Sequence, residues 1–376
     1  MKHGALRCVG VGPGRDLSRA KRPIEGLLLL TLTTLFAIDA CTPTPAEQVT
    51  INRQATLSPG HYVAGYSITR TPGGEFIVVG GTTLMNHTAW AARLDSSGKT
   101  KWEYLDGPSS SWTDYSTSDN QFFGAVELAN NTTLLCGVKK VGPRHVSFLL
   151  RIDESGNRID ERFPAVRGIS LRRCLRWDTG VAILGRGFLE RLDSEGNLLW
   201  DKYDDSYAAQ DAVESPDHGL FLISFSGDAT QIVRLDRDGA VIARHTVSGS
   251  EQRLMHPLSW SQHIFVGTMK STFESEFFEF DLNLNQLGHM SARNVGIKSG
   301  LELKDSSLVV FGSQYQNTAT ANVTRIYKNH QSANFPLQPL YSSPWYVDAV
   351  PGEAPGQFVT LRIVQGSTVV AWISIN

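Results

Sequence analysis

Residue types able to do chemistry are present in this 376-residue sequence, but they do not fall into a catalytic spacing. The ten histidines are scattered without an H-x-x-x-H or H-E-x-x-H pair, which a zinc site on one helix face requires. There is no G-x-S-x-G sequence that would present a nucleophilic serine, and no P-loop that would bind phosphate. We therefore expect neither a metal nor a cofactor, and the sequence assigns no catalytic residue.

Acidic residues leave one enzymatic alternative open. Two carboxyl groups that meet in space can cleave a glycosidic bond, and the 37 Asp and Glu residues offer many pairs. A hydrolase or lyase acting on a glycan is therefore an alternative function. The 35 Lys and Arg residues leave a net charge of −2, which argues against nucleic acid as a partner, because phosphates favour a strongly basic surface.

The first 40 residues read as an export signal. Lys21 and Arg22 precede the apolar run GLLLLTLTTLFAI, residues 26–38, which is too short to span a bilayer comfortably. The run ends in Ile38-Asp39-Ala40-Cys41, and Thr-Pro-Thr-Pro follows as an extended segment. We expect a signal peptide over residues 1–40 and a tether over 41–48, with a true start downstream of Met1; a plain signal peptide and an uncleaved anchor are the alternatives.

The segment around Cys41 resembles the bacterial lipobox, with an aliphatic residue three positions before the cysteine and a small residue directly before it. The resemblance implies a lipidated Cys41 that holds the protein in a membrane, because several acyl chains bind a bilayer far better than one. Asp39 departs from the usual lipobox. Thr42, rather than Asp, follows the cysteine, which in the enterobacterial sorting rule implies the periplasmic face of the outer membrane.

Cys136 and Cys174 are the other cysteines outside the leader. An oxidising compartment would allow them to pair. Both lie in strand-like sequences, TLLCGV and SLRRCLRW, in which a buried cysteine behaves as a small apolar residue. We favour two buried thiols, and pairing stays open.

The remainder of the chain is a repeat. Short apolar runs that end in a small residue, such as Ile77-Val78-Val79-Gly80, predict buried strands. Each is followed by a hairpin phrase whose first copy is RLDSSGKTKW, in which Asp can bond the backbone of a turn and Gly can adopt a positive φ. The phrase recurs every 40 to 58 residues, and we expect copies at the positions Asp95, Asp153, Asp193, Asp236, Asp281 and Tyr327.

This period is typical of one four-stranded blade of a β-propeller. Seven strand starts precede the apolar runs, so we expect an all-β propeller of about seven four-stranded blades in residues 49–376, with six or eight as alternatives. The last copy is one strand short. Residues 49–57, which come before the first complete copy, are expected to supply that outer strand and close the ring.

The hairpin phrase resembles those of bacterial outer-membrane propeller lipoproteins with quinoprotein-like architecture. In the quinoprotein motif the turn is longer, and Gly stands four residues after Asp, whereas Gly98 stands three after Asp95 here. The resemblance therefore implies the architecture without the cofactor, and propellers host many unrelated activities.

The loop from Gly107 to Gln121 lengthens the first repeat and is expected on the face where propellers usually bind. Trp112 and Tyr115 would give it contact area for a protein or sugar partner; a polar loop with its aromatic rings folded back is the alternative. Basic residues concentrate in the second and third repeats. The binding candidates are Trp112, Tyr115, Lys139, Lys140 and Arg144.

A complete scaffold without a catalytic pattern favours a non-enzymatic periplasmic lipoprotein whose propeller binds a protein partner. One special case is an immunity lipoprotein that neutralises a toxin directed at the periplasm. The glycan-active hydrolase or lyase is the enzymatic alternative. The sequence itself names no partner and no reaction.

Overall fold

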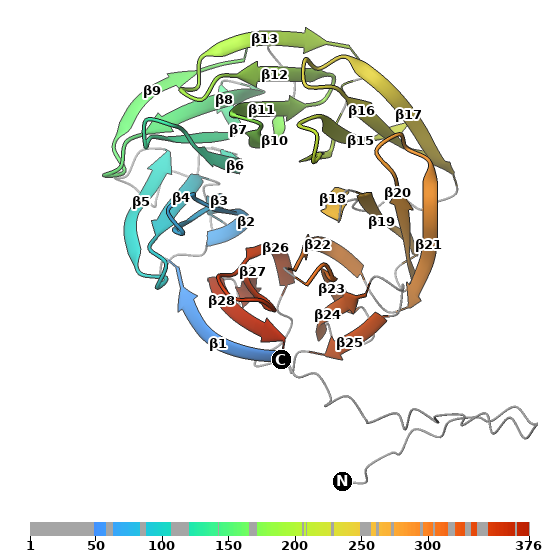
Figure 1. The fold of residues 1–376 in the computed structure, drawn as a ribbon. Coiled ribbons are helices and arrows are strands. Elements are labelled where there is room, and N and C mark those ends of the chain that lie inside the picture. The colour runs from blue at the N-terminus through green and yellow to red at the C-terminus, as the bar shows by residue number, and fades with distance from the viewer. Residues whose placement is uncertain are drawn as a thin grey trace, which may run out of the picture. The chain divides into compact units, whose positions relative to one another are not determined.

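A computed structural model shows seven four-stranded antiparallel sheets arranged around an axis, a seven-bladed β-propeller (Figure 1). It describes residues 49–375 apart from 58–62, 83–87, 107–119, 142, 165–170, 205–206, 208, 227–228, 249–256, 261–262, 272–273, 294–295, 304, 315–319, 328–331, 337–344 and 365–366. Within these residues there is no α-helix. The expected all-β class, the architecture and the number of blades are confirmed.

The first six blades each use four consecutive strands, counted outward from the axis. Blades 1 to 3 comprise β2 (Val63–Arg70), β3 (Phe76–Thr82), β4 (Ala89–Leu94), β5 (Thr100–Asp106); β6 (Gln121–Glu127), β7 (Thr133–Val141), β8 (Arg144–Ile152), β9 (Arg158–Arg162); β10 (Leu171–Trp177), β11 (Gly180–Gly185), β12 (Phe188–Leu192) and β13 (Leu198–Tyr203). Blades 4 to 6 comprise β14 (Asp211–Glu214), β15 (Leu220–Ser226), β16 (Ala229–Leu235), β17 (Val241–Ser248); β18 (Pro257–Trp260), β19 (His263–Ser271), β20 (Glu274–Phe280), β21 (Gln286–Arg293); β22 (Gly296–Glu302), β23 (Leu308–Gln314), β24 (Thr320–Ile326) and β25 (Ser332–Pro336).

The seventh blade joins the two ends of the propeller. Its inner strands are β26 (Trp345–Pro351), β27 (Gln357–Val364) and β28 (Ser367–Ile375), and its outer strand is β1 (Val49–Thr56). β1 runs antiparallel to β28, with Val49 opposite Ile375 and Thr56 opposite Val369. The expected closing strand is therefore confirmed, and a circular sheet order leaves the ring without an open end.

The core lies between blades rather than within one. Each of seven apolar clusters among the described residues draws on two adjacent blades, as where Ile77 and Val79 of blade 1 pack with Leu135 and Phe148 of blade 2. β3 is buried along its whole length, because each of its faces meets a neighbouring blade. Such burial on both faces explains why the second strand of a blade is a continuous apolar run.

The repeated Asp-x-x-Gly phrase forms the turn between the third and fourth strands. In the first copy the Asp95 carboxylate accepts bonds from the Ser97 and Lys99 amides at 2.8 and 2.9 Å, and the amide of Gly98 donates to the Asp95 carbonyl. Gly98 has a φ of 86°. The divergent copy at Asp281 forms the same turn, with Leu284 in place of glycine at a φ of 62°. The bonds to the aspartate are kept in this copy although the glycine is absent.

The turn glycines also dock one blade on the next. A β-carbon built on Gly239 of blade 4 would lie 2.4 Å from the Trp200 ring of blade 3. The same 2.4 Å separates a β-carbon on Gly98 of blade 1 from the Trp372 ring of blade 7. Glycine at these positions therefore satisfies two demands, a positive φ and a close approach by an aromatic ring.

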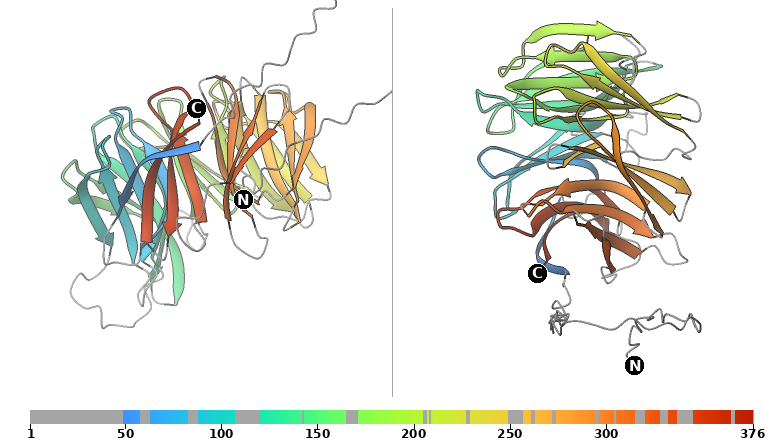
Figure 2. Two further views of the ribbon diagram at one scale, coloured as in Figure 1. Left: turned by 90° about the horizontal axis from the view of Figure 1, so that it is seen from below. Right: turned by 45° about the vertical axis from the view of Figure 1, so that its right-hand side comes forward.

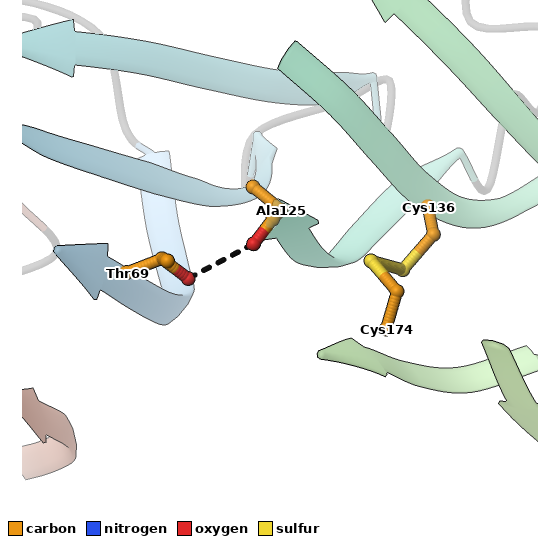
Figure 3. The surroundings of a disulfide bond; sticks show 4 residues. All are labelled: Thr69, Ala125, Cys136 and Cys174. Atoms are coloured by element: carbon orange, nitrogen blue, oxygen red, sulfur yellow. Dashed lines mark hydrogen bonds between the residues drawn. A yellow bond between two sulfur atoms is a disulfide. The ribbon is translucent and has the colours of Figure 1, made fainter. Parts of the chain in front are cut away.

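Cys136 and Cys174 form a disulfide, contrary to the preference for two buried thiols. The bond joins β7 of blade 2 to β10 of blade 3 (Figure 3). Both residues are buried in the apolar cluster between these blades, as the sequence pattern indicates. Gly124, opposite Cys136 in β6, makes the pairing possible, because a β-carbon there would lie 3.0 Å from the Cys174 sulfur.

Antiparallel blades give the ring two distinct faces. The turn face carries the connections between first and second strands and between third and fourth strands, including Asp95–Gly98. The loop face carries the other connections, including β7–β8 and β5–β6. Val49 opposes Ile375, whose amide bonds Gly356 in the β26–β27 turn, so the chain enters the propeller at the turn face.

By its contacts the chain divides into Met1–Ala46 and Glu47–Asn376. The first unit, with the expected signal peptide and Cys41, lies outside the described residues. Among the described residues no helix has the length and apolar character needed to cross a bilayer.

Candidate functional site

The β7–β8 hairpin carries three of the expected binding residues on the loop face. Figure 2 shows this hairpin extending beyond the neighbouring blades. Its strands have nine residues each, and their last pair is Val141 with Arg144. Arg144 is exposed and Lys140 is half-buried, while its amide is fixed by a 3.0 Å bond to the Asn120 side chain. The hairpin thus places Lys140 and Arg144 where it projects from this face.

Lys139 has a different environment from its neighbour. Its ammonium pairs with Glu161 of β9 and lies 5.2 and 5.1 Å from the ring centres of Phe148 and Phe163. The side chains of Lys139 and Glu161 are only 17% and 6% exposed, and Glu161 also pairs with Arg158 at 2.7 Å. Because its charge is already neutralised, Lys139 supports the base of the hairpin instead of presenting a free cation.

Side-chain alternation explains the difference. Val138 and Cys136 pack into the cluster between blades 2 and 3, whereas Phe148, which contacts Lys139, belongs to the cluster between blades 1 and 2. Alternate residues of a strand point to opposite faces, so Lys140 points toward blade 3 and Lys139 toward blade 1. Lys139 and Lys140 are adjacent basic residues in the sequence, but their side chains lie on opposite faces of the blade.

Asp106 ends β5 directly before the Gly107–Gln121 loop. It is 8% exposed, and burial raises the pKa of its carboxyl although Lys139 acts in the opposite direction. Burial also raises the pKa of Tyr104 to about 12, and its hydroxyl donates to Asp106 at 3.3 Å. A carboxyl with a raised pKa is the kind of acid that a hydrolase uses. Here Tyr104 bonds Asp106 and the charge of Lys139 acts on it, so we interpret Asp106 as a structural residue at the end of β5.

Trp112 and Tyr115 lie outside the described residues, as do all of residues 107–119 in their loop. Their role in binding stays a prediction. The described residues that border this loop are Asp106 and Asn120, and the Asn120 side chain also bonds the Asp106 carbonyl at 3.5 Å. The loop is therefore anchored at both ends beside the β7–β8 hairpin.

Polar residues of the innermost strands connect several blades around the axis. Asp348 of blade 7 accepts bonds from Ser67 of blade 1 at 2.8 Å and from Ser299 of blade 6 at 3.0 Å. Arg173 of blade 3 pairs with Asp211 of blade 4. Every bond named here crosses a blade boundary, so these residues hold the ring together at its centre.

A repeated arginine of the third strand was missed in the sequence. It stands two residues before the turn position of the hairpin phrase, as Arg234 does before Asp236 and Arg325 before Tyr327, and that regular place was the available signal. In blade 4 Arg234 pairs with Asp217 of the first turn, and in blade 6 Arg325 pairs with Asp305 in the same way. Blade 5 has Glu279 at the arginine position, and His263 is its partner at 2.6 Å. The position therefore carries a structural pair in blades 4, 5 and 6.

The turn face holds a cavity of about 430 Å³ near the boundary of blades 1 and 2. Arg93 lines it and bonds Glu75 and Glu127, each at 2.5 Å, and Lys101 bonds Glu75 at 2.8 Å. These charges neutralise one another, and Arg93 is only 7% exposed. No group of His, Cys, Asp and Glu in the described part of the chain could hold a metal ion.

Comparison with known proteins identifies the fold and no more. No protein family and no curated protein matches the chain. The crystal structure of BamB from Moraxella catarrhalis is similar over 87% of this chain and 98% of its own, with a TM-score of 0.51 and 10% identity. The structure of the Dos1 propeller covers 87% and 95%, with a TM-score of 0.56 and 12% identity. In all, 734 solved chains match, so the likeness singles out no activity.

Proposed function

We propose that this protein is a non-enzymatic periplasmic lipoprotein, held at the outer membrane through Cys41, whose propeller binds a protein partner with its loop face. The observation that carries the proposal is the projecting β7–β8 hairpin, with Lys140 and Arg144 on the face opposite the point where the chain enters. The fold of BamB and of the Dos1 propeller is compatible with a scaffold of this kind.

The disulfide supports export. Bonds such as Cys136–Cys174 persist in oxidising compartments, including the bacterial periplasm, and are rare in the cytosol. Both cysteines are buried, so the bond is a structural element of blades 2 and 3. The pairing therefore agrees with a cleaved leader before Cys41.

The entry point of the chain supports the direction of binding. Residues 41–48 would span at most about 28 Å when fully extended. A lipid on Cys41 would therefore keep Val49, and with it the turn face, near the membrane. The loop face with Lys140 and Arg144 would then point into the periplasm, where a protein partner could reach it.

Acylation is tested by metabolic labelling with an alkyne fatty acid in cells that express the full chain. We expect label on the wild type and none on Cys41→Ser, with the label in the outer-membrane fraction. Unlabelled wild-type protein would refute the anchor.

Binding is tested by placing a photo-crosslinking amino acid at position 144 of the loop face or, as a control, at position 97 of the turn face. We expect a discrete protein adduct in intact envelopes from position 144 and not from position 97. Equal labelling from both positions, or none from either, would refute the proposed binding face.

A further inference from the structure

We propose that the loop face of blades 2 and 3 takes an acidic protein segment, bound by Lys140, Arg144, Arg172 and Arg186. The inference rests on the proposed protein-binding function and specifies the chemistry of the partner. It adds Arg186 and also Arg172, one of the basic residues concentrated in the second and third repeats, and it leaves out Lys139, whose charge is neutralised by Glu161.

The four cations share one region of the loop face. Leu171 opposes Gly185 across β10 and β11, so Arg172 and Arg186, which follow them in sequence, lie at the loop end of blade 3. The Leu171 amide bonds the Ser147 hydroxyl at 2.9 Å, which places this end of blade 3 against β8 of blade 2. Lys140 points toward blade 3 from the projecting hairpin. Arg144 opposes Val141 at the hairpin tip, so alternation directs it to the other side of the hairpin, and it borders the region from the tip.

These cations differ from many arginines of the chain. Several arginines elsewhere pair with carboxylates, as Arg93 does with Glu75 and Arg173 with Asp211. Within the described residues, the side chains of Lys140, Arg144, Arg172 and Arg186 have no such carboxylate partner, and the three arginines are exposed. Positive charge without a carboxylate partner is therefore gathered on the loop face of blades 2 and 3.

The surroundings favour a protein segment. Val141, which lies opposite Arg144 at the end of the hairpin, is 51% exposed and gives apolar contact area beside that cation. Asp204, directly after β13, donates its amide to the Gly187 carbonyl, so this acidic residue borders the region next to Arg186. A basic site with an apolar edge and an acidic border can both attract an acidic segment and orient it.

The test uses the full chain, purified in detergent from cells that process its leader, and three labelled 12-residue peptides. One peptide alternates Glu with Leu and Ser, and the others replace Glu by Gln or Lys. Fluorescence anisotropy in 50 mM and 300 mM NaCl measures binding. We expect the Glu peptide to bind at least tenfold more tightly than the Gln peptide at low salt and to weaken as salt rises.

Charge reversal locates the site. Lys140→Glu with Arg186→Glu should weaken the Glu peptide at least tenfold, whereas Lys99→Glu on the turn face should change its affinity less than twofold. Lys140→Gln with Arg186→Gln, a milder pair, should weaken it at least threefold, and circular dichroism must show an unchanged fold. Equal affinity for the Glu and Gln peptides, or an equal loss in Lys99→Glu, would overturn the inference.

Two further outcomes separate this inference from the proposed function. If Cys41→Ser retains peptide binding while the wild type proves not to be acylated, the anchor fails and the acidic-segment site stands. If position 144 forms its adduct while the Glu peptide does not bind, the binding face stands and the acidic-segment site fails. Vesicles of phosphatidylglycerol offer a third outcome. If the protein binds them more tightly than the Glu peptide, and Lys140→Glu with Arg186→Glu abolishes that binding, the site is assigned to lipid and the inference is overturned.

Discussion

Gly239, in the β16–β17 turn of blade 4, lies against the indole ring of Trp200 in β13 of blade 3. A β-carbon at Gly239 would come within 2.4 Å of that ring, and the residue has a φ of 73°. One position therefore determines both the conformation of a turn and the docking of two blades.

Gly239→Ala should destabilise the protein, because the methyl group requires a strained φ and displaces Trp200. The expected loss is about 2 kcal/mol of unfolding free energy. Urea unfolding followed by tryptophan fluorescence measures it. Gly73→Ala is the control, since its β-carbon would meet only the Thr71 hydroxyl at 3.8 Å; comparable losses in both variants would contradict the docking role.

The disulfide between Cys136 and Cys174 should contribute substantially to stability. It closes a loop with a sequence separation of 38 residues, for which the chain-entropy relation gives about 4 kcal/mol at 25 °C. We expect dithiothreitol to lower the urea midpoint of the wild type and to leave that of Cys136→Ala with Cys174→Ala unchanged. An unaltered wild-type midpoint, with free thiols verified by labelling, would show that the bond is dispensable.

Truncation of the adjacent lysines Lys139 and Lys140 should affect stability unequally. Lys139→Ala leaves Glu161 buried with Arg158 as its remaining partner, so we expect a loss of about 1–2 kcal/mol. Lys140→Ala should change stability by less than about 0.5 kcal/mol, because its ammonium makes no ion pair within the described residues. Thermal unfolding of the two variants measures the difference. Similar losses of stability in both variants would contradict the prediction.

Acid should destabilise the propeller through its turn aspartates. The Ser97 hydroxyl holds the pKa of Asp95 below its usual value, the Asn157 amide does so for Asp153, and the Asn285 side chain does so for Asp281. A carboxyl with a lowered folded pKa stabilises the protein above its unfolded pKa, and this stabilisation is lost as pH falls through the folded pKa. Stability should therefore decline below about pH 4.

Asp281→Asn tests this mechanism. The variant should be less stable than the wild type at pH 7 and should lose less stability between pH 5 and pH 3, because one titrating carboxyl is gone. Melting temperatures measured across this pH range check the difference. Parallel profiles for the two proteins would exclude Asp281 from the acid response.

The fold was predictable because its determinants are local. The Asp-x-x-Gly turn needs only the Asp95 carboxylate, nearby amides and one glycine, so each hairpin is visible in sequence. The closing strand followed from a blade that lacked its fourth strand. The order of the hairpins and of the closing strand along the chain was therefore sufficient to predict a closed ring of blades.

The site was less predictable because it depends on contacts between blades. Whether Cys136 meets Cys174 depends on the space left by Gly124, which lies on a third strand. Whether Lys139 is neutralised depends on Glu161 of β9. Arg172 lies in β10 and Arg186 directly follows β11, so the pairing of these two strands brings both arginines to the same end of blade 3. Charge counts along the sequence do not contain these relationships.

The pairing of β1 with β28 has a consequence for biogenesis. The first strand of the propeller must wait for the last one to be synthesised before either finds its partner, so blade 7 cannot close on a nascent chain. If the chain is exported as proposed, the ring therefore closes only after its C-terminal strand has crossed the inner membrane.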